Sequence, residues 1–324
     1  MDFYPQAVEM TPERIAKTEV FLNKFGLRYE GGADHTVQLL SEYGEILGTG
    51  SLCGNVLKYI AVDERLRGEG AALTLVSRLV SEAYQRGATK LFLFTKAGNE
   101  MLFRGCGFYT LASTRDVCFM ENSRTGLDRW LASVPRYEGK VGACVMNCNP
   151  FTLGHRYLIA SAAGQVDRLY VFVVSEDKSR FPFAQRLEMV KKGTADIPNV
   201  TVLPSGEYMI SKATFPTYFI KEGADADSIY ASLDLTLFAQ KIAPALNITR
   251  RFVGTEPYCA VTNRYNEIMK TLLPPQGIEV TELERLGGIS ASRVREALDR
   301  GDENTVRTYV PVTTADLILK GETK

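Results

Sequence analysis

A threonine and a histidine three residues apart, Thr152 and His155, lie where a strand-like run changes into a helix-like one. The chain contains only two histidines, and this one directly follows Gly154. The free N–H groups and the positive dipole end of a helix start favour an anion, and glycine lets the backbone approach that anion closely. An imidazole there could donate to a phosphate oxygen. A packed helix-start histidine is the alternative, but the strand, loop, glycine and helix together favour phosphate binding.

Two hydroxyls and an arginine near the C-terminus could form a second phosphate site. Ser290, Ser292 and Arg295 lie in the stretch GGISASRVR, at the start of a helix-like segment. We expect Ser292 to be the N-cap residue and Arg295 to donate two hydrogen bonds to a phosphate. Alone, the stretch would indicate only a capped helix with surface arginines. Together with the Thr152–His155 pattern it predicts attack on the α-phosphate of a nucleoside triphosphate.

Other side chains that follow strands could complete this site. Lys178 could hold the triphosphate and Arg186 could contact a phosphate, although a solvated loop lysine and a helix-surface charge are the alternatives. Gly254 and Glu256, at another strand end, could line the adenine and ribose. We expect catalysis by His155, assisted by Thr152 and Lys178. The expected nucleotide contacts are Asn149, Phe151, Gly154, Arg186, Gly254, Glu256, Ser290, Ser292 and Arg295.

The second half of the chain must position these residues. Apolar runs that indicate buried strands alternate with helix-like segments, and the strands are expected at 141–147, 168–175, 200–203, 250–256 and 278–283. The helices are expected at 155–165, 184–193, 229–245, 261–273 and 292–300. This α/β alternation predicts a Rossmann-like, doubly wound parallel sheet. Such sheets bind ligands beyond the C-terminal ends of their strands, where the candidate residues lie.

The first half has a different pattern and predicts a separate α+β domain. Short apolar runs broken by glycines at 36–62 indicate an antiparallel meander. A helix at 69–86, a strand at 90–95 and a short helix at 99–104 follow. A chain of 324 residues is expected to form two domains, and we place them at 1–135 and 136–324.

A glycine pattern in this first domain indicates a second ligand. Arg65, Gly68 and Gly70 form R-x-x-G-x-G at a strand-to-helix junction, where backbone N–H groups can converge on a pyrophosphate. A glycine-rich helix start without a ligand is the alternative. The pattern, together with Asn99 and the sequence GCGF at 105–108, resembles the GNAT acetyltransferases, which bind coenzyme A there. The resemblance implies that a CoA-like ligand contacts Arg65, Arg67, Gly68, Gly70, Ala71 and Asn99.

The second domain also resembles a known group. TLGH at 152–155 and ISASRVR at 289–295 are similar to the (H/T)xGH and ISxTxxR signatures of the nucleotidyltransferase α/β-phosphodiesterase superfamily. Here the first position holds threonine, a weaker neutral donor than histidine. The runs CNPFTLGHRYLI, VSEDKSRFPF and VGTEPYCAVTNRYN resemble the citrate lyase ligase family, and the likeness extends over almost the whole chain.

This resemblance implies a specific reaction. ATP and acetate would give acetyl-adenylate and pyrophosphate. The acetyl group would then pass to the thiol of a phosphoribosyl-dephospho-CoA group on the acyl carrier subunit of citrate lyase, releasing AMP. Mg²⁺ would accompany the triphosphate. Acetate and the carrier follow only from the resemblance, whereas adenylylation and a CoA-like ligand also follow from the residues.

Composition excludes several other classes of protein. Lys+Arg and Asp+Glu both total 38, so no net charge attracts nucleic acid or an anionic membrane. The sequence has no apolar run close to the roughly 20 residues that span a bilayer, and no secretion signal is recognised. Six cysteines without a CxxC pair, and only two histidines, disfavour a zinc site. We therefore expect a cytoplasmic protein with reduced thiols and no protein-bound metal.

Three alternative functions stay open from the sequence. One is a pantetheine-phosphate-type adenylyltransferase, whose reaction has no need of the first domain. Another is an acetyl-CoA-dependent N-acetyltransferase with a nucleotide-sensing domain, and the third is a non-catalytic nucleotide-binding module. ATP–pyrophosphate exchange, measured with and without acetate, separates them.

Overall fold

The computed structural model describes residues 2–210, 215–257 and 259–319. The chain forms two compact units, Met1–Arg129 with Phe215–Ile229, and Trp130–Thr214 with Tyr230–Lys324. The extreme ends of the predicted domains, at residue 1 and at 320–324, lie outside the described residues. The boundary after residue 135 stays a prediction, and no sequence pattern indicated that Phe215–Ile229 belongs with the first unit.

The first unit is built on a seven-stranded sheet with the order β1-β2-β3-β4-β5-β7-β6. Its neighbouring strands are antiparallel except for β4 and β5, which run parallel and pair only at two positions, Val56 with Phe92 and Leu57 with Leu93. The strands are β1 (Tyr4–Val8), β2 (His35–Leu40), β3 (Ile46–Cys53), β4 (Val56–Val62), β5 (Phe92–Lys96), β6 (Tyr109–Ser113) and β7 (Val117–Glu121). The expected meander at 36–62 is confirmed as β2, β3 and β4, whereas β1 was not predicted.

Helix α2 (Ala71–Gln85) covers this sheet with an apolar face. Leu75, Val76, Leu79 and Ala83 recur at helical spacing, are fully buried and join the core of the unit. The helix predicted at 69–86 is therefore confirmed. The other helices and turns of this part of the chain are α1 (Pro12–Asn23), η1 (Glu64–Leu66), η2 (Ala97–Asn99), α3 (Glu100–Gly105) and α4 (Gly126–Ala132).

The segment Phe215–Ile229 supplies aromatic side chains to the first unit. The ring of Tyr218 lies 4.8 Å from that of Tyr59, measured between centroids, and Phe215 meets Phe94 edge-on. The main-chain N–H of Arg28 donates to the carbonyl oxygen of Tyr218 at 2.9 Å, and the Arg28 guanidinium donates to other main-chain carbonyl oxygens of this segment. The core of the first unit thus contains residues far apart in sequence.

The second unit contains the expected parallel sheet, with the strand order β10-β9-β8-β11-β12. Its strands are β8 (Val141–Met146), β9 (Arg168–Val173), β10 (Val200–Pro204), β11 (Ile248–Gly254) and β12 (Glu279–Leu283). The chain order reverses between β8 and β11. A crevice at the carboxyl ends of these two strands is where a doubly wound sheet binds its ligand.

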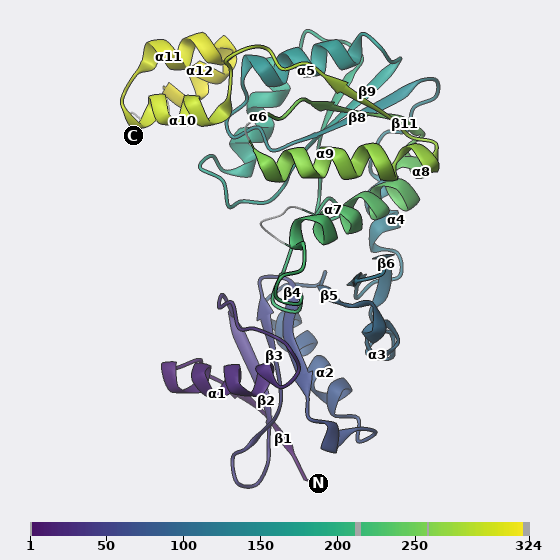
Figure 1. Ribbon diagram of the computed structural model, residues 1–324, viewed down its shortest axis with the longest axis vertical. Coiled ribbons are helices and arrows are strands. Elements are labelled where there is room, and N and C mark those ends of the chain that lie inside the picture. The colour runs from purple at the N-terminus through teal and green to yellow at the C-terminus, as the bar shows by residue number, and fades with distance from the viewer. Residues whose placement is uncertain (1, 211–214, 258, 320–324) are drawn as a thin grey trace. The chain divides into compact units, whose positions relative to one another are not determined.

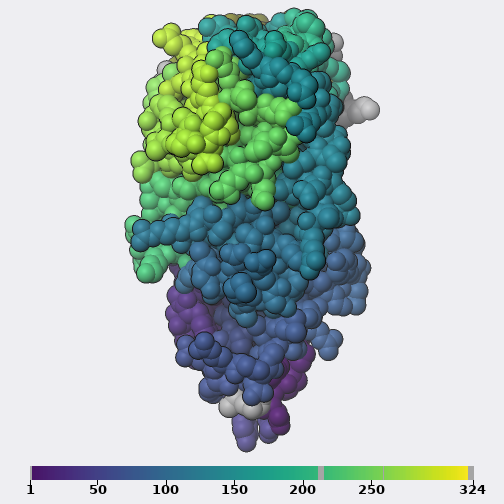
Figure 2. Space-filling model, turned by 90° about the vertical axis from the view of Figure 1, so that its right-hand side faces the viewer, coloured from purple at the N-terminus to yellow at the C-terminus, as the bar shows by residue number. Residues whose placement is uncertain are grey.

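Helices cover both faces of this sheet, and Figure 1 shows α5 and α9 on opposite sides of the strands. One side holds α5 (Leu153–Ala163) and α6 (Phe183–Gly193), which share a core with the C-terminal helices. Figure 2 shows those C-terminal helices, in yellow, at the surface beside teal residues of the same unit. The remaining elements are α7 (Ala226–Leu237), a π-helical turn η3 (Phe238–Ile242), α8 (Ala243–Ala245), α9 (Ala260–Leu272), η4 (Pro274–Gln276), α10 (Ala291–Asp299), α11 (Glu303–Tyr309) and α12 (Val312–Leu319).

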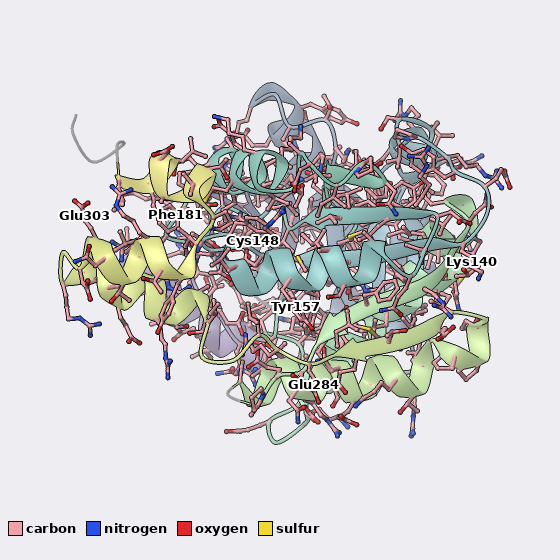
Figure 3. All side chains as sticks on the ribbon, turned by 90° about the horizontal axis from the view of Figure 1, so that it is seen from above. Lys140, Cys148, Tyr157, Phe181, Glu284 and Glu303 are labelled. Carbon is pink, nitrogen blue, oxygen red and sulfur yellow. The ribbon has the colours of Figure 1, made fainter. Side chains whose placement is uncertain are left out.

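The loop after β8 begins where the strand leaves the core. In Figure 3, Lys140 and Cys148 mark the two ends of this strand. Cys148 is buried with Phe181 in the core under α5 and α6.

Within the part of the chain that the structure describes, no helix combines the length and the apolar composition needed to cross a membrane.

Candidate active site

The loop between β8 and α5 holds Thr152 and His155 in a reciprocal cap. The main-chain N–H of His155 donates to Thr152 Oγ1 at 3.3 Å, and the N–H of Thr152 donates to His155 Nδ1 at 3.1 Å. Nδ1 therefore acts as an acceptor, so in the neutral ring the proton lies on Nε2. The cap thus fixes the tautomer as well as the helix start, and leaves Nε2–H as the donor for a ligand.

The charge state of His155 follows from its surroundings. Burial lowers the pKa of this imidazole, and the positive charge of Arg285 lowers it further, to about 4. The ring is therefore neutral at physiological pH and can donate from Nε2 without carrying a charge.

A second helix start faces the same region. Ser290 is the N-cap of α10, with extended backbone, and its Oγ accepts from the N–H of Arg293 at 3.2 Å. The prediction that Ser292 is the N-cap was wrong, because the helix begins at Ala291 and Ser292 lies within its first turn. Ser292 Oγ accepts a hydrogen bond from Arg295 Nη2 at 2.9 Å instead.

Arg295 connects the two helix starts. Its Nη1 donates to the carbonyl oxygen of Asn149 at 2.5 Å, in the loop that leads to Thr152. The motif near the C-terminus is therefore bonded directly to the motif after β8, although they are far apart in sequence.

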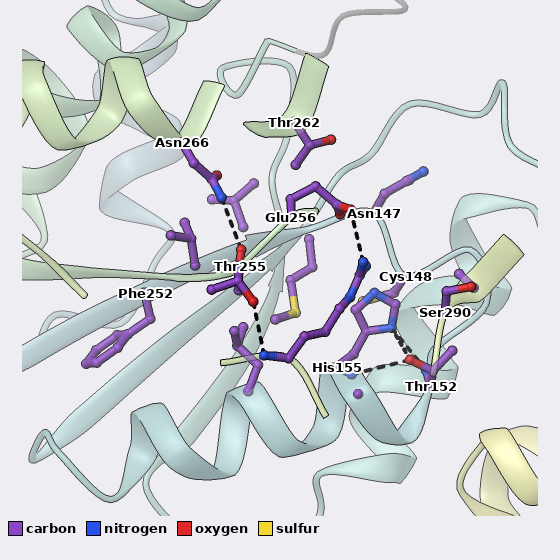
Figure 4. A pocket seen from close by; sticks show the side chains of 18 of the residues that line it. Asn147, Cys148, Thr152, His155, Phe252, Thr255, Glu256, Thr262, Asn266 and Ser290 are labelled. Carbon is purple, nitrogen blue, oxygen red and sulfur yellow. Dashed lines mark hydrogen bonds and ion pairs between the residues drawn. The ribbon is translucent and has the colours of Figure 1, made fainter. Parts of the chain in front are cut away.

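A cavity of about 440 Å³ lies at the carboxyl ends of β8 and β11, where the strand order reverses. Figure 4 shows His155 and Thr152 on one side of it, with Glu256 and Thr255 opposite. Two thirds of the expected catalytic and nucleotide-binding residues line this cavity: Asn149, Thr152, Gly154, His155, Gly254, Glu256, Ser290 and Arg295.

Four expected site residues do not line it. Phe151 is fully buried and packs against Gly193, so it supports the loop from below. Lys178 is exposed, and its main-chain N–H donates to Glu176 Oε1. Ser292 lines a neighbouring cavity instead.

Arg186 is the fourth, and the structure gives it a different environment from the expected phosphate contact. Its side chain is fully buried and donates to the carbonyl oxygens of Phe181, Asn147, Val174 and Glu176, and to Asn147 Oδ1. These acceptors belong to the loops that follow β8 and β9. Arg186 therefore holds the two strand-end loops together, as a buried arginine with several carbonyl partners can.

Several cavity residues were missed by the sequence analysis. Arg285 lies two residues after the end of β12, and its Nη1 pairs with Glu256 Oε1 at 3.0 Å. Asn266 Nδ2 donates to the carbonyl oxygen of Gly254 at 3.0 Å. The rule that strand ends carry functional residues could have found Arg285. It could not have found Arg251, which lines the cavity from within β11.

The first unit contains a cleft of its own. β4 and β5 pair with each other at only two positions. A cavity of about 440 Å³ is lined by Ile60 and Val62 on β4 and by Thr95 and Lys96 on β5. Of the residues expected to bind a CoA-like ligand, Asn99 lines this cleft, and it donates to Thr95 Oγ1 at 3.3 Å.

The glycine loop lies between β4 and α2. Gly68 and Gly70 have φ values of +87° and +71°, which favour glycine, and Gly70 precedes the buried Ala71 at the helix start. Arg67 is exposed, whereas Arg65 is held by Asp63 and by Glu45 through ion pairs of 2.8 and 2.7 Å. Arg65 therefore shapes the loop that presents the N–H groups of α2.

Comparison with known proteins identifies the family. Residues 141–318 match the family described as the citrate lyase ligase C-terminal domain, and residues 5–108 match the acetyltransferase (GNAT) family. The chain is 44% identical over 331 residues to the citrate (pro-3S)-lyase ligase of Escherichia coli, covering 97% of this chain and 92% of that protein. The chain belongs to the citrate lyase ligase family. The ligase of Klebsiella pneumoniae is also 44% identical, over 328 residues that cover 97% of this chain and 95% of that protein.

Citrate lyase ligases are enzymes, and this chain, as a member of the family, is an enzyme too.

A more distant likeness is limited to part of the chain. Phosphopantetheine adenylyltransferase of an Arthrobacter species is 24% identical over 181 residues, which are 55% of this chain and 96% of that protein. The match with the ligase family extends over both units, and it therefore confirms the expected combination of a GNAT-like domain with a nucleotidyltransferase-like domain.

Proposed function

We propose that the protein uses ATP to convert acetate into acetyl-adenylate and pyrophosphate. The acetyl group then passes to the thiol of a CoA-like prosthetic group on the acyl carrier subunit of citrate lyase, which activates that enzyme and releases AMP. The main support is that the neutral Nε2 donor of His155 and the helix start capped by Ser290 line one cavity at the strand ends.

The first step requires positive potential and no proton transfer. A carboxylate oxygen attacks the α-phosphorus, the new O–P bond forms, and the bond to the bridging oxygen breaks so that pyrophosphate leaves with the electron pair. His155 Nε2–H can donate to the phosphate oxygens where charge develops, assisted by the N–H groups at the start of α10. Because His155 is neutral, it stabilises this charge without acting as an acid.

Mg²⁺ would enter with the nucleotide, held by phosphate oxygens and water. Among residues 2–210, 215–257 and 259–319, no three or more His, Cys, Asp or Glu side chains form a group that could hold a metal ion.

The second step concerns the thiol of the carrier. The thiol loses its proton to solvent, its sulfur attacks the acyl carbon, and the bond from that carbon to the AMP oxygen breaks. The cleft between β4 and β5, with the glycine loop beside it, would bind the CoA-like arm. All six cysteines are free thiols, which fits the cytoplasmic location that we propose.

ATP–pyrophosphate exchange tests this function. We expect label to pass from pyrophosphate into ATP with acetate, and not with citrate or without a carboxylate, and we expect excess chelator to abolish the exchange. Exchange without acetate would contradict the acyl-adenylate step. Exchange that depends on phosphopantetheine would favour the adenylyltransferase alternative, and acetyl-CoA-dependent acetylation of an amine would favour the N-acetyltransferase.

A further inference from the structure

One charged side chain in the second unit is buried without adequate partners. Arg251, in β11, is only 3% exposed, and its Nε and Nη1 atoms have no hydrogen-bond partner. Buried polar groups are nearly always hydrogen-bonded, and an unpaired buried charge is costly. An arginine in this state needs an explanation, and a ligand that supplies acceptor atoms is one.

The strand pattern places Arg251 toward the layer formed by α9. Successive side chains of a strand point to opposite faces, and Phe252 packs in the core under α5. Figure 4 shows Phe252 on one side of the strand and Asn266 of α9 on the other. Arg251 therefore lies on the α9 side. Four α9 residues at helical spacing line the cavity together with Arg251: Thr262, Tyr265, Asn266 and Met269.

Neighbouring groups hold the guanidinium without satisfying it. It lies over the ring of Phe238, with 4.6 Å between the central carbon and the ring centroid. The buried carboxylate of Asp234 interacts with it electrostatically, but the oxygens of that carboxylate accept from Tyr265 Oη at 2.5 Å and from the N–H of Ile210 at 2.8 Å. Arg251 is thus oriented by a ring and by a carboxylate that is already bonded elsewhere.

We propose that Arg251 binds the carboxylate of the acyl substrate, a small aliphatic carboxylate. This inference rests on the proposed function. The phosphate donors of the cavity come from helix starts at its rim, whereas Arg251 lies within the strand that forms its wall. A planar guanidinium stacked on a ring suits a planar carboxylate. One carboxylate oxygen accepts from Arg251, and the other attacks the α-phosphorus as pyrophosphate leaves with the bonding electrons.

Substitution of Arg251 tests this subsite. In Arg251→Met and Arg251→Lys we expect the KM for acetate in the exchange reaction to rise about 10- to 100-fold, the range given by loss of a charge-assisted hydrogen bond. The affinity for a non-hydrolysable ATP analogue, measured by calorimetry, should stay within about twofold. The melting temperature of Arg251→Lys should stay close to that of the wild type, because lysine keeps a positive charge beside the buried Asp234.

Arg250→Gln is the matched control. Arg250 is the preceding residue of the same strand, points to the opposite face and pairs with Glu279 at 2.7 Å. Its substitution should leave the KM for acetate unchanged.

Two results would overturn the subsite. One is a loss of ATP affinity with an unchanged KM for acetate, which would make Arg251 a phosphate contact. The other is an unchanged KM for acetate in folded Arg251→Lys, which would make Arg251 structural. If the wild-type protein shows no acetate-dependent exchange, the proposed function fails. In that case the affinity for acetate, measured by titration into the wild type and into Arg251→Lys with the ATP analogue present, still tests the subsite. Equal affinities in the two proteins would overturn it.

Discussion

His155 is a donor whose chemistry is set by its neighbours. The N–H of Thr152 fixes its tautomer, and burial together with Arg285 keeps the ring neutral. The same Nδ1 that accepts from Thr152 also completes the cap of α5. One side chain therefore has a structural role at Nδ1 and, in our proposal, a catalytic role at Nε2, and a substitution can separate the two.

The variant His155→Gln should separate them. Glutamine three residues after a threonine N-cap forms an ordinary capping box, so the melting temperature should change little. The exchange rate should fall about 10²- to 10³-fold, as for loss of a transition-state donor. His155→Ala should lose both the rate and about 1 kcal/mol of stability. Near-normal exchange in folded His155→Gln would remove His155 from the proposed role.

The lowered pKa of His155 also predicts how stability depends on pH. Between its ordinary value of 6.5 and about 4, the unfolded chain binds a proton at this position and the folded chain does not. Acidification through this window therefore destabilises the wild type, on the order of 1–3 kcal/mol by pH 4. Urea unfolding at several pH values should show this loss relative to His155→Gln. Parallel profiles for the two proteins would contradict the lowered pKa.

At the scale of elements, the site depends on loops that are bonded to one another. Arg295 joins α10 to the loop after β8, and Arg186 joins that loop to the one after β9. The rigid part of the site is thus a set of strand ends and helix starts tied by two arginines. Neither arginine needs to touch a phosphate to matter for catalysis.

Arg186→Lys tests this second tie. Lysine cannot reproduce the planar set of donors, so several buried carbonyl groups would lose their partner. We expect the free energy of unfolding to fall by about 2–4 kcal/mol, measured by urea denaturation. Lys191→Met, an exposed change on the same helix, should stay within about 0.5 kcal/mol of the wild type. A loss of ATP affinity without a loss of stability would instead support the original expectation of a phosphate contact.

At the scale of the whole molecule, the two units have separate clefts and, in our proposal, separate steps. The cavity with His155 would form the acyl-adenylate, and the cleft of the GNAT-like unit would bind the thiol arm. A defect in one cleft should therefore slow one step only.

Gly68→Glu and Gly70→Glu should lower the rate of acetyl transfer to the carrier thiol about 10-fold or more, because the new carboxylate repels the pyrophosphate of the arm. The rate of ATP–pyrophosphate exchange should stay within about twofold of the wild type. The matched control is Gly87→Glu, at the other end of α2. Gly87 has the same type of positive φ, +83°, and open space around it. Equal loss of both steps in the Gly68 and Gly70 variants would contradict this division.

The sequence predicted features that depend on local pattern and missed those that depend on burial. The strand–loop–helix around His155 and the helix start at Ser290 are local, and their spacing fits the cavity that both line. Arg186 and Arg251 have the same sequence appearance as surface arginines, and only the packed sheet makes them buried. The N-cap was placed two residues late because two serines offered the same chemistry.

The segment Phe215–Ile229 has a consequence for how the protein is made. Synthesis proceeds from the N-terminus, so residues up to Arg129 leave the ribosome long before Tyr218 can pack on Tyr59. The first unit in the chain is therefore completed only after much of the second has been translated. A fragment ending at Arg129 would expose Tyr59 and Phe94 to water, and the nascent chain passes through that same state.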